Sequence, residues 1–103
     1  MSTFKNVEIS KEANIYFDGK VTSRKVKFRD GVVKTLGIMM PGSFEFGTEQ
    51  HEIMEITAGE MNVLLSGKTE WQTIQAGESF KVPANSSFKA EVKSLVDYCC
   101  SYS

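Results

Sequence analysis

Turn signals recur roughly every ten residues along this chain, and this spacing limits its possible folds more than any other feature. Short segments rich in Val, Ile, Phe, Thr and Met separate the turns. The turns are Asp18-Gly19, Asp30-Gly31, Pro41-Gly42, Ala58-Gly59, Ser66-Gly67, Ala76-Gly77 and Pro83-Ala84-Asn85. Many short strands at such regular spacing are typical of an all-β sandwich or barrel.

Apolar side chains alternate with polar ones in several of these segments, as expected for strands with one buried face. The positions expected to face the core include Met61, Val63 and Leu65 in one segment and Phe80 and Val82 in another. Glu52 shares its expected face with Met54 and Ile56, so one carboxylate lies in an otherwise apolar row.

The length and composition predict one small domain without a linker or repeat, since the chain has 103 residues. A net charge of −1 gives no electrostatic footprint for nucleic acid. The apolar runs are too short to span a bilayer, and the first residues lack the apolar stretch of a secretory signal.

Cys99 and Cys100 are adjacent, so on a strand they point to opposite faces and do not bond each other. Two reduced thiols in a chain without a visible signal suggest the cytoplasm. The short apolar runs predict no contact with a membrane.

The segment from Gly77 to Phe88 has the spacing of the second sequence motif of cupin barrels, G-x5-P-x-G-x2-H. Asn85 replaces the second glycine, and Asn tolerates a positive φ better than most residues. Phe88 replaces the histidine that binds a metal in that motif. The resemblance implies a cupin-like β-barrel or jelly roll of about 8–11 short strands without the usual metal chemistry.

The first cupin motif ends in E-x6-G, and Glu52 with Gly59 fits this spacing. The His-x-His pair expected a few residues earlier is absent, and His51 lies directly beside Glu52. A metal site needs three or four converging ligands, so we expect neither a metal nor another cofactor. A carboxylate among inward-facing apolar residues has a raised pKa or a specific partner, which makes Glu52 a candidate catalytic residue. The alternative is a solvated or ion-paired Glu52 near a strand end.

Aromatic and basic side chains suggest how a ligand is held. Phe44, Phe46 and Phe88 are candidates for stacking on a flat ligand such as a nucleobase, although each ring also fits a plain core. In the basic stretch from Lys20 to Arg29, Lys20 and Arg24 are candidates for holding phosphate; the alternative is a solvated strand face.

Five segments together resemble the small cupin-like pyrimidine/purine nucleoside phosphorylases of bacteria. They are Asn14-x-Tyr16-Phe17-x-Gly19-Lys20-Val21, Gly59-x-Met61-Asn62-Val63-Leu64-Leu65, Trp71-Gln72, Gly77-x2-Phe80-x-Val82-Pro83 and Tyr98-x-Cys100-x-Tyr102. The resemblance covers residues 13–103, which we take as the cupin-like domain, and leaves residues 1–12 as an N-terminal extension. It implies metal-independent phosphorolysis, in which a purine or pyrimidine nucleoside and phosphate yield a free base and a pentose 1-phosphate.

This reaction suggests a role for each candidate residue. Cleavage of an N-glycosidic bond builds positive charge on the sugar, which the Glu52 carboxylate would stabilise. The leaving base needs a hydrogen-bond donor or a proton, which Tyr16, Asn85 or a water would supply.

Three other functions remain open at this point. A non-catalytic barrel would bind a nucleoside or sugar without phosphate-dependent product. A metal-dependent cupin enzyme would carry a transition metal and lose activity with a chelator. A purely structural protein would use its apolar strand faces for association alone. A barrel this small often pairs through a sheet face or edge, so we expect a homodimer in every case.

Overall fold

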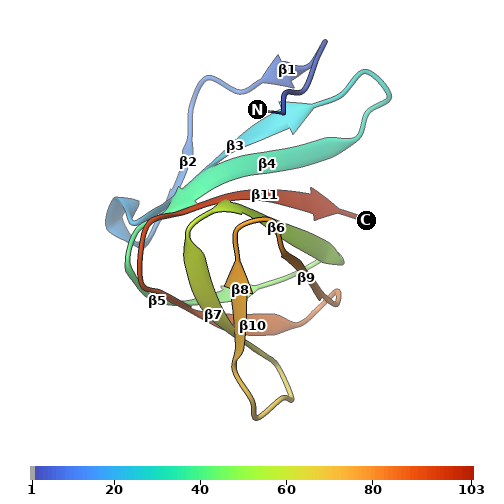
Figure 1. Cartoon of the computed structure of the whole chain (residues 1–103). Coiled ribbons are helices and arrows are strands. Elements are labelled where there is room, and N and C mark those ends of the chain that lie inside the picture. Colours follow the sequence, from blue (N-terminus) through green and yellow to red (C-terminus); the bar gives the residue numbers. More distant parts are fainter. Residues whose placement is uncertain (1) are drawn as a thin grey trace.

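The computed structural model describes residues 2–103 and confirms the all-β prediction (Figure 1). Eleven strands form two sheets, a number within the range that the cupin resemblance implies. The only helical segment in this range is η1 (Phe17–Gly19), a 3-10 turn. No helix in the described part of the chain has the length and apolar character needed to cross a membrane.

The larger sheet has seven antiparallel strands and carries the row that includes Glu52. Its order is β1-β3-β4-β11-β6-β9. The β2 strand pairs with the first residues of β3, and β1 pairs with the last ones. The strands are β1 (Glu8–Ile9), β2 (Asn14–Tyr16), β3 (Val21–Lys27), β4 (Val33–Met39), β6 (Glu52–Ala58), β9 (Ser79–Val82) and β11 (Val96–Tyr102).

The smaller sheet has four antiparallel strands in the order β5-β10-β7-β8 and faces the larger one (Figure 1). The strands are β5 (Gly42–Gly47), β10 (Ser87–Val92), β7 (Glu60–Leu65) and β8 (Gln72–Gln75). Among residues 2–103 no strand pairing joins the two sheets, so they pack face to face without closing into a hydrogen-bonded barrel.

The core lies between the sheets and follows the predicted alternation. Met61, Val63, Phe80 and Val82 are buried, and Leu65 packs against the core from its edge. Asn85 has a φ of 54°, the left-handed conformation that its place in the turn predicts.

The β11 strand separates its two cysteines as expected. Cys99 and Cys100 are both buried and both free. Cys100 faces the space between the sheets, whereas Cys99 lies on the other face of the strand.

The proposed N-terminal extension contains one short strand. In β1, Glu8 pairs with Lys27 and Ile9 pairs with Val26, so these residues extend the edge of the larger sheet. Val26 is fully buried on the outer face. The domain boundary at residue 12 stays a prediction.

Gly37 on β4 is a position at which an added side chain would displace its neighbours. A Cβ there would overlap the Thr22 carbonyl oxygen and lie 2.6 Å from the Tyr98 hydroxyl. That hydroxyl donates a hydrogen bond to the same carbonyl at 3.1 Å, so the added atom would displace a buried contact.

We therefore expect Gly37→Ala to lower the free energy of unfolding by about 3 kcal/mol, measured by urea denaturation. Gly47→Ala is the control, because the nearest atom to its added Cβ lies 3.9 Å away. That variant should stay within about 1 kcal/mol of the wild type. Equal stabilities for the two variants would contradict the close packing at Gly37.

Candidate functional site

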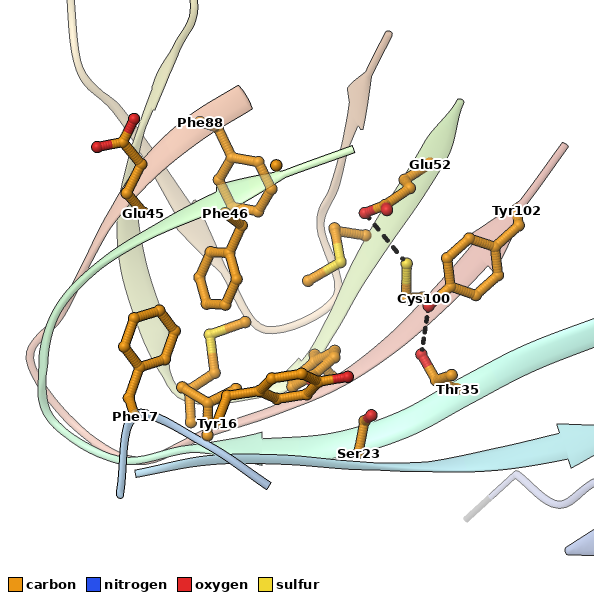
Figure 2. Close-up of a pocket in the computed structure, with 15 residues that line it drawn as sticks. Tyr16, Phe17, Ser23, Thr35, Glu45, Phe46, Glu52, Phe88, Cys100 and Tyr102 are labelled. Carbon is orange, nitrogen blue, oxygen red and sulfur yellow. Dashed lines mark hydrogen bonds between the residues drawn. The ribbon is translucent and has the colours of Figure 1, made fainter. Parts of the chain in front are cut away.

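A cavity of about 340 Å³ lies between the two sheets and is lined by residues of both (Figure 2). Four of the residues predicted for the site lie in its lining, namely Glu52, Tyr16, Phe46 and Phe88. Figure 2 shows Glu52, Cys100, Tyr102 and Thr35 on one side of the cavity and three phenylalanines with Glu45 on the other, so we describe a polar wall and an aromatic wall.

The polar wall consists of Thr35, Glu52, Cys100 and Tyr102, from β4, β6 and β11. Cys100 and Tyr102 share a face of β11, and Tyr102 pairs directly with Glu52 on β6. The Cys100 thiol donates a hydrogen bond to Glu52 Oε1 at 3.6 Å. The Tyr102 and Thr35 hydroxyls form a second hydrogen bond at 3.1 Å (Figure 2). These contacts fix the carboxylate and two hydroxyls at neighbouring positions.

Burial raises the pKa of each acidic side chain in the polar wall. It raises the pKa of Glu52 above its ordinary value, and the hydrogen bond from Cys100 partly opposes this rise. Burial, followed by the neighbouring Glu52 carboxylate, raises the pKa of the Cys100 thiol to about 12. Burial also raises the pKa of the Tyr102 phenol. At neutral pH the thiol and the phenol therefore keep their protons and act as hydrogen-bond donors.

The aromatic wall consists of Phe17, Phe46 and Phe88. Phe46 stacks on Phe88 with ring centroids 5.2 Å apart and an interplanar angle of 29°. Phe17 meets the edge of Phe46 at 5.6 Å. Phe17 has a φ of 52° in η1, a costly conformation for an aromatic residue that its ring packing against Phe44 and Phe46 helps to hold.

Four other residues predicted for the site lie outside the cavity lining. Phe44 is buried behind it, with its ring 6.2 Å from that of Phe46. Arg24 lies on the outer face of β3, where its Nε donates to the Lys11 carbonyl at 3.4 Å. Lys20 follows η1 and is exposed, and Asn85 occupies the turn before β10. Their roles in binding stay predictions.

Cys100, Tyr102 and Thr35 are not among the residues predicted for the site. The signal for the first two was present, since Tyr98-x-Cys100-x-Tyr102 places three side chains on one face of a strand. Only the pairing of β11 with β6 brings that face beside Glu52. Thr35 is 67 residues from its partner Tyr102, a contact that no local pattern reveals.

The donor groups around the cavity do not fit a metal ion. Phe88 occupies the place of the motif histidine and packs between Phe46 and Phe80. His51 lies outside the lining, with Nδ1 3.1 Å from the Ser103 hydroxyl. Within residues 2–103 no three His, Cys, Asp or Glu side chains converge as a metal site requires.

The charged residues that line the cavity are all acidic. It contains the carboxylates of Glu45 and Glu52. Among the described residues that line it there is no Lys, Arg or His. The cavity therefore suits a neutral or cationic group better than an anion.

Comparison with known proteins gives one consistent family. A family model described as pyrimidine/purine nucleoside phosphorylase matches residues 11–102. A protein of that name from Colwellia psychrerythraea is 65% identical over 102 residues, covering 99% of this chain and 98% of its own.

Solved structures support the fold. A protein of unknown function from Acinetobacter sp. ADP1 has a TM-score of 0.96 and 41% identity, covering 98% of both chains. An RmlC-like cupin from Shewanella frigidimarina has a TM-score of 0.70 at 16% identity, covering 98% of this chain and 86% of its own. This likeness confirms the cupin-like fold.

The raised pKa of Glu52 predicts how stability depends on pH. A carboxyl with a higher pKa in the folded state binds its proton more tightly there than in the unfolded chain. The contribution of Glu52 to the free energy of unfolding therefore falls as the pH rises from the ordinary pKa of 4.5 through the raised value. Glu52→Gln does not ionise, so its stability relative to the wild type should increase from pH 4 to pH 7 in urea denaturation.

Glu55→Gln is the matched control, because Glu55 is exposed on the other face of the same strand. Its stability difference from the wild type should change less over this pH range. The same change in both variants would contradict a specific burial effect at Glu52.

Proposed function

Because the chain belongs to the pyrimidine/purine nucleoside phosphorylase family, we propose that it phosphorolyses a broad range of purine and pyrimidine nucleosides without a metal. The products are the free base and a pentose 1-phosphate. One observation of the structure supports this function most strongly. The half-buried Glu52 carboxylate faces a cavity whose other side is a wall of phenylalanine rings.

The reaction exchanges one bond at the anomeric carbon of the sugar. The C1′–N bond breaks and a C1′–O bond to phosphate forms. The bonding electron pair leaves with the base, which takes up the proton of hydrogen phosphate. Positive charge develops on C1′ and the ring oxygen as the bond breaks, and a carboxylate beside them stabilises that charge. Glu52 fits this role in its ionised form, which the Cys100 thiol supports by donating to Oε1.

The aromatic wall accounts for broad base specificity. Phe46 is only partly buried and lines the cavity beside Phe88, so a flat base can lie against its ring. Stacking tolerates different bases because every base presents a π-face. Tyr16 lines the same cavity and is half exposed, which makes it a better candidate than Asn85 for donating to the leaving base.

The negative charge of the cavity lining supports a second candidate function. A lining with two carboxylates and no cation among the described residues suits the binding of a neutral nucleoside without reaction. Such a module would bind nucleosides saturably and would release no base on addition of phosphate.

The main test is release of free base from uridine, inosine and adenosine with and without phosphate, followed by chromatography. We expect base and pentose 1-phosphate only with phosphate, and equal rates after treatment with a chelator. Glu52→Gln should lower turnover about 100- to 1,000-fold, because it removes the charge that stabilises the transition state.

Glu55→Gln serves again as the control and should retain wild-type turnover. Near-normal turnover of Glu52→Gln would remove this residue from the mechanism. Saturable binding without product from any nucleoside would instead support the non-catalytic module.

The aromatic wall gives a separate prediction for substrate affinity. Phe46→Leu should raise KM for all three nucleosides about 10- to 100-fold, because base stacking on an aromatic ring contributes about 1–3 kcal/mol. KM for phosphate should change little. Phe28→Leu is the control, since Phe28 packs against Phe4 away from the cavity. An effect on one nucleoside only would argue against stacking as the source of broad specificity.

A further inference from the structure

Among the described residues that line the cavity, none carries a positive charge that could hold phosphate. Hydrogen phosphate carries two negative charges, and the lining adds the carboxylates of Glu45 and Glu52. Like charges at a few ångströms repel strongly where water is partly excluded. Phosphorolysis therefore needs a cationic position that is close to the cavity but separate from its carboxylates.

A second hollow, of about 600 Å³, adjoins the cavity and has the opposite charge. Thr35 and Tyr102 line both spaces and so form a shared wall between them. The polar side chains on the far side of that wall are Asn14, Lys25 and Gln50. The described lining of this hollow contains no Asp or Glu.

Strand geometry explains why Lys25 faces this hollow. Val21 and Ser23 line the cavity from β3, and Lys25 is the next residue of the same alternating row. Lys25 also pairs directly with Thr35 on β4. The lysine therefore continues the inner face of the larger sheet just beyond the shared wall.

We propose that this second hollow is the phosphate subsite of the enzyme, with Lys25 as its cation. The inference rests on the proposed phosphorolysis. The Thr35 and Tyr102 hydroxyls bond each other, which uses one of their two hydrogens and leaves the other for a phosphate oxygen. The Asn14 amide and the Gln50 amide supply further donors around the hollow.

This arrangement separates the charges of the reaction. The shared wall of Thr35 and Tyr102 lies between the two spaces, with Glu52 on the cavity side and Lys25 on the other. A base against the aromatic wall places the sugar toward Glu52 and the shared wall. Phosphate then reaches the anomeric carbon from the side opposite the leaving base, as an in-line exchange requires.

The test is Lys25→Met, which keeps most of the apolar stem and removes the charge. We expect KM for phosphate to rise at least about tenfold, in line with loss of a charge-assisted contact, while KM for uridine changes less than about twofold. Lys27→Met is the control, because Lys27 lies on the same strand but lines a different hollow. It should keep the wild-type KM for both substrates.

A binding measurement makes the outcome independent of turnover. Inorganic phosphate should raise the thermal unfolding midpoint of the wild type and of Lys27→Met but not that of Lys25→Met, with sodium chloride at equal ionic strength as reference. Active wild type with an unchanged KM for phosphate in Lys25→Met would overturn the subsite and leave the phosphorylase function intact. A raised KM in Arg24→Met alone would place phosphate on the outer face and also overturn it. If the wild type is inactive but phosphate raises its unfolding midpoint and does not raise that of Lys25→Met, the phosphorolysis is overturned and the anion site is supported.

Discussion

The strict alternation of side chains along β3, β4, β6 and β11 is the constraint on which the rest of this structure depends. Each strand directs every second residue to its inner face, where the residue fills the core or lines the cavity or the second hollow. On β6, Met54 and Ile56 fill the core and Glu52 reaches the cavity. A shift of one residue in any of these registers would replace the site with outward-facing side chains.

The two sheets make different contributions to the site. The seven-stranded sheet supplies the polar wall, and the four-stranded sheet with η1 supplies the aromatic wall. Polar groups on the inner face cost free energy unless they find partners, and Glu52 and Thr35 find theirs on β11. Chemistry and stability are therefore coupled here, because the hydrogen bonds that allow polar groups inside the sandwich also fix the positions of those groups.

Much of this arrangement was predictable from local patterns, and the remainder depends on contacts that are distant in sequence. Regular turns gave the all-β fold, and the apolar row around Glu52 placed its carboxylate on the inner face. On β3, Lys25 points inward and Arg24 outward, although Val26 is also buried on the outer face beside β1. Both faces of β3 are thus partly apolar, and the hydrophobic pattern alone does not show which basic residue points inward. The polar wall required the pairing of β11 with β4 and β6.

The protonated state of Cys100 has a consequence for the resistance of the site to chemical damage. Thiols react with peroxides and disulfides as thiolates, and a thiol with a pKa of about 12 has almost no thiolate at neutral pH. The Glu52 carboxylate accepts a hydrogen bond from the thiol, and its negative charge disfavours formation of the thiolate. The cavity thus uses cysteine as a small donor while suppressing its redox reactivity, so an oxidising environment should leave this side chain unchanged.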